Sequence, residues 1–136
     1  MRNIQMLYPQ GEIMLKKLIA VLMIIGFSNF VNAQEVAKDQ WVAAMKTALP
    51  AAFCNSAQYF RQCFDVTAVE CEEAAASTTR ICLTELNSQI PNILIQPKDG
   101  TLWGTKVGEC AGNAYEASLI KKRISNAECN NVSNLQ

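Results

Sequence analysis

Six cysteines restrict the folding of this 136-residue chain more than any other feature. All of them follow a hydrophobic N-terminal segment. They are Cys54, Cys63, Cys71, Cys82, Cys110 and Cys129. An even number of cysteines behind an export signal is typical of a protein that folds under oxidising conditions and forms structural disulfides. The chain also contains no histidine, so it lacks the commonest general base and the commonest metal ligand.

The segment from Met14 to Ala33 has the three parts of a secretory signal peptide. Two lysines give it a short basic start, typical of bacterial leaders, and an apolar run of ten residues covers 18–27. Small residues then precede a cleavage site between Ala33 and Gln34. Because a membrane-spanning helix needs about 20 apolar residues, we expect a cleaved leader, with Met14 as the true start.

The chain after the leader forms one unit in our interpretation. We expect a signal peptide over 1–33 and a single cysteine-rich helical domain over 34–136, periplasmic or secreted, without a transmembrane segment after cleavage. This domain contains nine Lys and Arg residues and eleven Asp and Glu residues, which gives a net charge of −2. This balance gives no attraction to nucleic acid, so we expect no nucleic-acid partner.

Apolar residues at helical spacing predict a mainly α fold, a small disulfide-stapled bundle of about four helices. The expected helices cover 40–49, 51–64, 67–90 and 113–127. The third is the clearest, because Thr67 and Glu70 form a capping box that satisfies free backbone donors. We expect Pro50 to interrupt the first helix.

The 22 residues between the third and fourth helices are too many for a structureless connection in a compact domain. Apolar residues at 92–96 and 101–105 flank the sequence Pro97-Lys-Asp-Gly100, which suits a tight turn. The pattern predicts a short β-hairpin over 92–105.

The inner four cysteines are spaced symmetrically about one point of the chain. Cys63 and Cys71 are centred on residue 67, and Cys54 and Cys82 are centred on residue 68. Nested disulfides across a helical hairpin would have this spacing, with Cys63–Cys71 as the preferred pair. The spacing is similar to that of CHCH-type twin-cysteine hairpins, although the arms here hold eight and ten intervening residues where that family has nine.

Cys110 and Cys129 then remain to pair with each other. A helix between them would hold them roughly 20 Å apart, whereas a disulfide needs Cα atoms within about 7 Å. Either that helix is short, or these two cysteines pair with Cys54 and Cys82. Six cysteines allow fifteen connectivities, and spacing alone does not decide among them.

We expect no catalytic residue, metal or cofactor. The chain has no Cys-x-x-Cys pair for thioredoxin-type chemistry and no close ligand pairs for structural zinc. Glu70, Glu72 and Glu73 could act as paired carboxylates, but acidic residues in the first turn of a helix also stabilise its dipole, and we favour that explanation. The protein is therefore expected not to be an enzyme.

Five residues are candidates for interaction with a partner. Arg61 lies among aromatic residues, where a carboxylate or another buried group would have to satisfy it. Lys121, Lys122 and Arg123 form the basic run of the domain, and Trp103 could insert into a lipid interface beside them.

Two hypotheses follow. The first is an exported, non-enzymatic module that binds another protein in the bacterial envelope or the extracellular space. The alternative is an anionic lipid or membrane-surface binder, such as a secreted host-directed factor, that uses Trp103 and the basic run at 121–123.

Overall fold

The computed structural model describes residues 33–131, and these residues are mainly helical, which confirms the expected fold class. In chain order the elements are β1 (Gln34–Ala37), α2 (Lys38–Phe53), α3 (Tyr59–Gln62), α4 (Ala68–Leu86), β2 (Ile93–Gln96), α5 (Lys98–Ser118) and the 3-10 helix η1 (Ile120–Lys122). The expected signal peptide lies outside the described residues except for Ala33.

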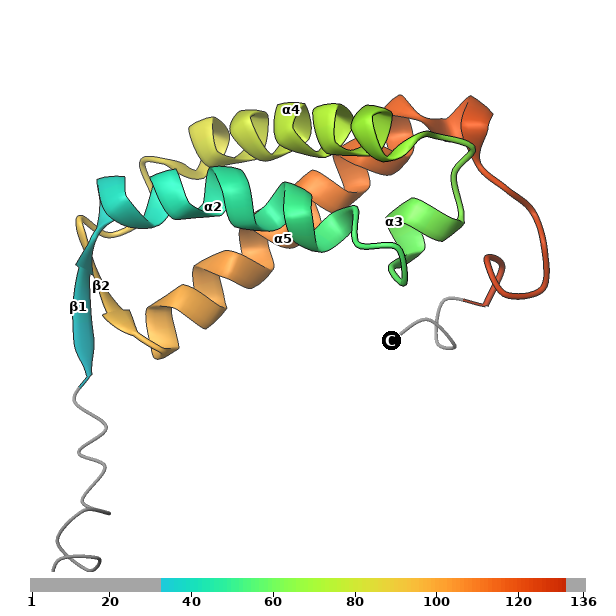
Figure 1. Cartoon of the computed structure of the whole chain (residues 1–136). Coiled ribbons are helices and arrows are strands. Elements are labelled where there is room, and N and C mark those ends of the chain that lie inside the picture. Colours follow the sequence, from blue (N-terminus) through green and yellow to red (C-terminus); the bar gives the residue numbers. More distant parts are fainter. Residues whose placement is uncertain (1–32, 132–136) are drawn as a thin grey trace, which may run out of the picture. The chain divides into compact units, whose positions relative to one another are not determined.

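Helices α2 and α4 lie side by side, and α5 crosses beneath them (Figure 1). The two strands lie at the end of the bundle where α2 begins, and the short helix α3 lies at the opposite end. Within the described part of the chain, none of the helices combines the length and the apolar character that crossing a bilayer requires.

Helix α4 begins where the sequence indicates. The backbone N–H of Glu70 donates to the Thr67 hydroxyl at 3.1 Å, and the Thr67 N–H donates to the Glu70 carboxylate at 2.7 Å. Both bonds of the capping box are therefore present. The same carboxylate lies 3.2 Å from the Lys122 amine, which ties the start of α4 to η1.

The Glu70 carboxylate makes the free energy of unfolding depend on pH in acidic solution. The hydrogen bond from the Thr67 N–H, with Lys122 second, lowers the pKa of Glu70 from its ordinary value of 4.5. A lowered folded-state pKa means that this stabilisation is present above pH 4.5 and is lost as the pH falls through the folded-state value. We expect Glu70→Gln to flatten the fall in urea midpoint below pH 4.5. Equal slopes in the variant and the unmodified protein would contradict this role.

The predicted hairpin over 92–105 is wrong, although its first strand exists. Strand β2 pairs antiparallel with β1, with Val36 opposite Leu94, and residues 101–105 belong to α5. The Ile95 N–H, on the edge of β2 that faces away from β1, donates to the Asp99 carboxylate at 2.7 Å. This bond occupies a backbone donor on the edge of β2 that a second hairpin strand would have used. Strand β2 pairs instead with β1, at the start of the domain.

Helix α5 covers 98–118 in place of the expected 113–127. Its core stripe is Trp103, Val107, Ala111 and Tyr115, spaced by four residues and buried along the whole helix. The expected helix start at 113–116 therefore lies inside α5. Three glycines within the first eleven residues lower the helix propensity, and packing of this stripe overrides that cost.

Two of the α5 glycines are sites where alanine should stabilise the protein. A Cβ added at Gly104 or Gly108 meets no atom within 4 Å, whereas a Cβ at Gly112 meets the Phe60 ring at 3.0 Å. Alanine restricts the unfolded backbone, so Gly104→Ala and Gly108→Ala should each raise the free energy of unfolding by about 0.5–1 kcal/mol. Gly112→Ala is the matched control and should gain less or lose stability in urea unfolding. A loss of stability in the Gly104→Ala variant would contradict the open space beside Gly104.

Helix α2 does not end at Pro50. The helix continues to Phe53, and Pro50 is buried within it. The chain then breaks at 54–58, so only Tyr59–Gln62 of the expected helix over 51–64 forms a helix of its own. The buried Pro50 shows that contacts with the core outweigh its missing donor.

The described core has two parts. One lies between α2, α4 and α5 and contains both tryptophans, Trp41 and Trp103. The other lies around α3 and is rich in cysteine and aromatic residues, including Phe64 and Tyr115.

Candidate interaction surface

All six cysteines form disulfides, which connect Cys54 to Cys71, Cys63 to Cys129 and Cys82 to Cys110. The preferred pair Cys63–Cys71 is therefore wrong, as is the nested pair Cys54–Cys82. Cys82–Cys110 was among the alternatives that the spacing allowed.

The path of the chain after α5 explains this pairing. Because α5 ends at Ser118, the following residues return along the segment that joins α3 to α4. The Ile124 N–H donates to the Cys63 carbonyl at 2.8 Å, and Phe64 and Arg123 form an isolated β-bridge. These contacts bring Cys129 to Cys63. Cys54, which caps α2, then meets Cys71 in the first turn of α4.

Five aromatic residues pack in the same cluster as two of these disulfides. The Tyr115 ring lies edge-on to Phe60 and Phe64, with ring centroids 5.1 and 5.2 Å away, and Phe53 stacks on Phe60. The Tyr115 hydroxyl donates to the Phe60 carbonyl at 3.0 Å, and burial raises the pKa of Tyr115. Tyr59 is the fifth aromatic residue of this cluster, and the cluster is part of the core.

Arg61 and Arg123 stabilise the fold at the end of the molecule that contains α3. Arg61 donates to the Val66 carbonyl at 2.8 Å. Arg123 donates to the Tyr59 hydroxyl at 3.2 Å and to the Cys129 carbonyl at 2.8 Å. Burial raises the pKa of Tyr59, and the hydrogen bond from Arg123 opposes that rise. Both guanidinium groups therefore hold backbone segments in place.

The structure does not bring the residues of the lipid hypothesis together. Trp103 is only 8% exposed and packs in the core, with the Lys106 amine 4.5 Å from the centre of its ring. Fifteen helical residues separate Trp103 from the end of α5, a distance of about 22 Å. Lys122 is paired with Glu70, so Lys121 is the member of the basic run without a partner among the described residues.

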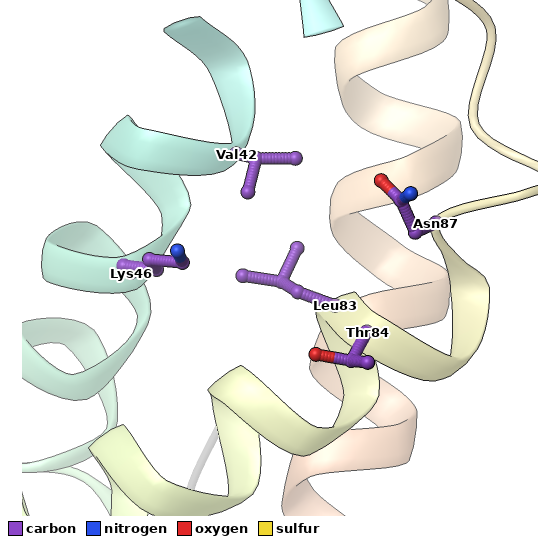
Figure 2. A pocket seen from close by; sticks show the side chains of 5 residues that line it. All are labelled: Val42, Lys46, Leu83, Thr84 and Asn87. Carbon is purple, nitrogen blue, oxygen red and sulfur yellow. The ribbon is translucent and has the colours of Figure 1, made fainter. Parts of the chain in front are cut away.

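A groove between α2 and α4 is a more coherent candidate site (Figure 2). Leu83 points between the helices toward Val42 and forms the floor with it. Lys46 stands on the α2 wall, and Thr84 and Asn87 stand on the α4 wall. The groove has a volume of about 220 Å³.

The polar groups of the groove are only partly satisfied. The Thr84 hydroxyl donates to the Arg80 carbonyl at 2.9 Å, and the backbone carbonyl of Asn87 accepts from the Lys38 amine at 3.2 Å. The Lys46 amine makes no ion pair or hydrogen bond with another described residue. The groove therefore offers an unpaired cation beside an apolar floor.

Sequence reasoning missed this groove. Lys38, Val42 and Lys46 follow each other at a spacing of four residues, which places them on one side of α2. That spacing is visible in the sequence, but it does not indicate that this side borders Leu83 of α4.

One cluster of potential metal ligands occurs among the described residues. It consists of Cys82, Glu85 and Cys110, whose ligand atoms lie within 4.8 Å of one another. Both sulfur atoms are joined in a disulfide, so neither is available as a thiolate.

Comparison with known proteins gives one result. No curated protein and no solved structure matches the chain significantly. A family model described as "T2SS substrate NttA" matches residues 35–123, well over half of the chain, from β1 through η1. The disulfide-bonded helical protein therefore belongs to the NttA family of T2SS substrates, and it is exported to the periplasm or beyond.

Proposed function

We propose that this exported protein acts by binding another protein at the α2–α4 groove and does not catalyse a reaction. The observation that carries the proposal is the unpaired Lys46 amine beside the apolar floor of Val42 and Leu83 in the described part of the chain. Leu83 is only 3% exposed, so the floor is part of the packed core and its position is fixed.

The chemistry of the groove favours a protein segment with an acidic residue next to an apolar one. A carboxylate would pair with Lys46, and an apolar side chain would cover Val42 beside the buried Leu83. Pockets for small molecules usually enclose about 300–1,000 Å³, more than the 220 Å³ found here. A surface of this size instead suits one or two side chains of a larger partner.

The family match supports a place of action outside the cell. Disulfides form in the periplasm, and here one of them closes a loop across 66 residues. The chain therefore acquires its fold in that compartment, and type II secretion would then release it. A tagged protein should accumulate in the medium of cells with an intact type II system and in the periplasm of cells without one. Equal amounts in both media would contradict release by this route.

A crosslinking experiment tests the binding site. A photo-reactive amino acid in place of Asn87, on the α4 wall of the groove, leaves the Lys46 amine intact and should give a discrete adduct with a partner protein, which excess unmodified protein suppresses. The matched control carries the same group at Lys121, an exposed lysine that also lacks a described partner, and should give no such adduct.

Two results would overturn the proposal. The first is an adduct that unmodified protein and the Lys46→Glu variant suppress equally well, because the groove would then not recognise charge. The second is robust turnover of common esters, glycans or peptides by the purified protein, because the protein would then be an enzyme.

A further inference from the structure

We infer that the solvent-facing side of α4 binds the same side of α4 in a second copy of this chain, with the two helices antiparallel. The residues concerned, called the α4 ridge below, are Val69, Glu73, Ala76, Ser77, Arg80 and Thr84.

The α4 ridge is continuous and lacks a described partner. At 3.6 residues per turn its six residues fall within about 100° of the helix circumference. The centre of the buried face of α4, with Cys71, Ala75 and Cys82, lies on the opposite side, and the buried Leu83 borders the ridge beside Ala76. Val69 is 62% exposed, and neither the Glu73 nor the Arg80 side chain pairs with another described residue.

The order of residues along the ridge is self-complementary. The acidic Glu73 lies toward the start of α4, the basic Arg80 lies toward its end, and the small residues Ala76 and Ser77 lie between them. In an antiparallel pair centred between residues 76 and 77, Glu73 of each copy faces Arg80 of the other. The same register places Val69 against the methyl group of Thr84. A parallel pair would instead place Glu73 on Glu73 and Arg80 on Arg80, so charge selects the antiparallel arrangement.

The small residues at the centre allow close approach. Ala76 and Ser77 carry no long side chain, so two helix backbones can meet there while the longer Glu73 and Arg80 side chains reach across on either side. The ridge extends over about 22 Å from Val69 to Thr84. A contact of this length is smaller than a standard stable interface, so we expect a weak dimer that forms at high protein concentration.

Charge reversal tests the register. The disulfide-bonded protein, purified from an oxidising compartment, should show a sedimentation mass that rises toward the dimer with concentration and falls back in high salt. Glu73→Arg and Arg80→Glu alone should each weaken association by about tenfold, because each converts two attractive contacts into two repulsive ones. Both side chains are exposed, so the melting temperature of each variant should match that of the unmodified protein.

Mixing the two variants is the decisive step. In a mixed pair, the arginine introduced by E73R in one copy would face the glutamate introduced by R80E in the other. At the opposite end of the contact, the native Arg80 and Glu73 would still face each other. An equimolar mixture of the E73R and R80E proteins should therefore dimerise when neither does alone. Lys121→Glu, which reverses an exposed charge outside α4, is the control and should leave association unchanged.

Three results would overturn the inference. A protein that stays monomeric at every attainable concentration would contradict a contact between two copies. A dimer that persists equally in both single variants would use another face. A mixture that remains monomeric, when the unmodified protein dimerises, would exclude the antiparallel register.

Discussion

Replacing Cys63 and Cys129 with alanine is expected to lower the free energy of unfolding by about 4 kcal/mol, the largest loss for any one disulfide. This disulfide joins residues 66 positions apart, whereas Cys54–Cys71 and Cys82–Cys110 span 17 and 28 positions. A crosslink that closes a longer loop removes more conformational freedom from the unfolded chain. It also anchors the segment after α5, which Arg123 holds by two further hydrogen bonds.

Urea unfolding of the three double alanine variants, one for each disulfide, tests whether the loss of stability increases with loop length. Loss of Cys54–Cys71 should cost about 3 kcal/mol, so it serves as the matched comparison within the same part of the core. The Cys63/Cys129 variant should also expose the 124–131 segment to protease while α2, α4 and α5 remain folded. Equal losses for the two variants would show that loop length does not control stability here.

Tyr115→Ala is expected to lower the free energy of unfolding by about 3–5 kcal/mol, the range typical for truncating a large buried aromatic residue. Tyr115 is 0% exposed and contacts the rings of Phe60 and Phe64, so truncation opens a cavity at the centre of the aromatic cluster. It also removes the hydrogen bond to the Phe60 carbonyl. Since α3 is a single helical turn, we expect Tyr59–Gln62 to lose its order first.

Tyr115→Phe separates packing from hydrogen bonding. It keeps the ring and removes only the hydroxyl, so it should cost about 1 kcal/mol. It also tests the pH dependence. Because burial raises the pKa of Tyr115 from 10.0, the associated stability is present below pH 10.0 and is lost as the pH rises through the folded-state value. The Phe variant should therefore lose stability less steeply above pH 10.0, and equal slopes would assign the effect to other groups.

The sequence predicted local features well where one segment carried the whole signal. The capping box at Thr67 and Glu70 needs only four consecutive residues, and the structure has both of its hydrogen bonds. The strand at 93–96 was expected from its own apolar residues. The mainly helical class followed from apolar spacing in α2 and α4, although the boundaries shifted because Pro50 is accommodated within α2.

Prediction was wrong where a residue's partner lies far along the chain. Strand β1 has four residues and no alternating pattern of its own, so nothing in Gln34–Ala37 indicated that it pairs with β2. Helix α5 is rich in glycine, and its Trp103 side became recognisable only through packing against α2 and β2. In the site, the sequence places Leu83 and Asn87 on one helix, but it gives no sign that they face Lys46.

Three properties of this protein follow from the residues alone: the cysteines are even in number, they serve as structural crosslinks, and the described part of the chain is mainly helical. Composition and short-range spacing are local, so they carry this information without any knowledge of the fold. The identity of the cysteine pairs and the side chains that border the groove depend instead on tertiary packing. Cys63 meets Cys129 because the chain after α5 returns beside residues 63–65. That return depends on the joint packing of α3, α4 and α5, and no segment of the sequence encodes it alone.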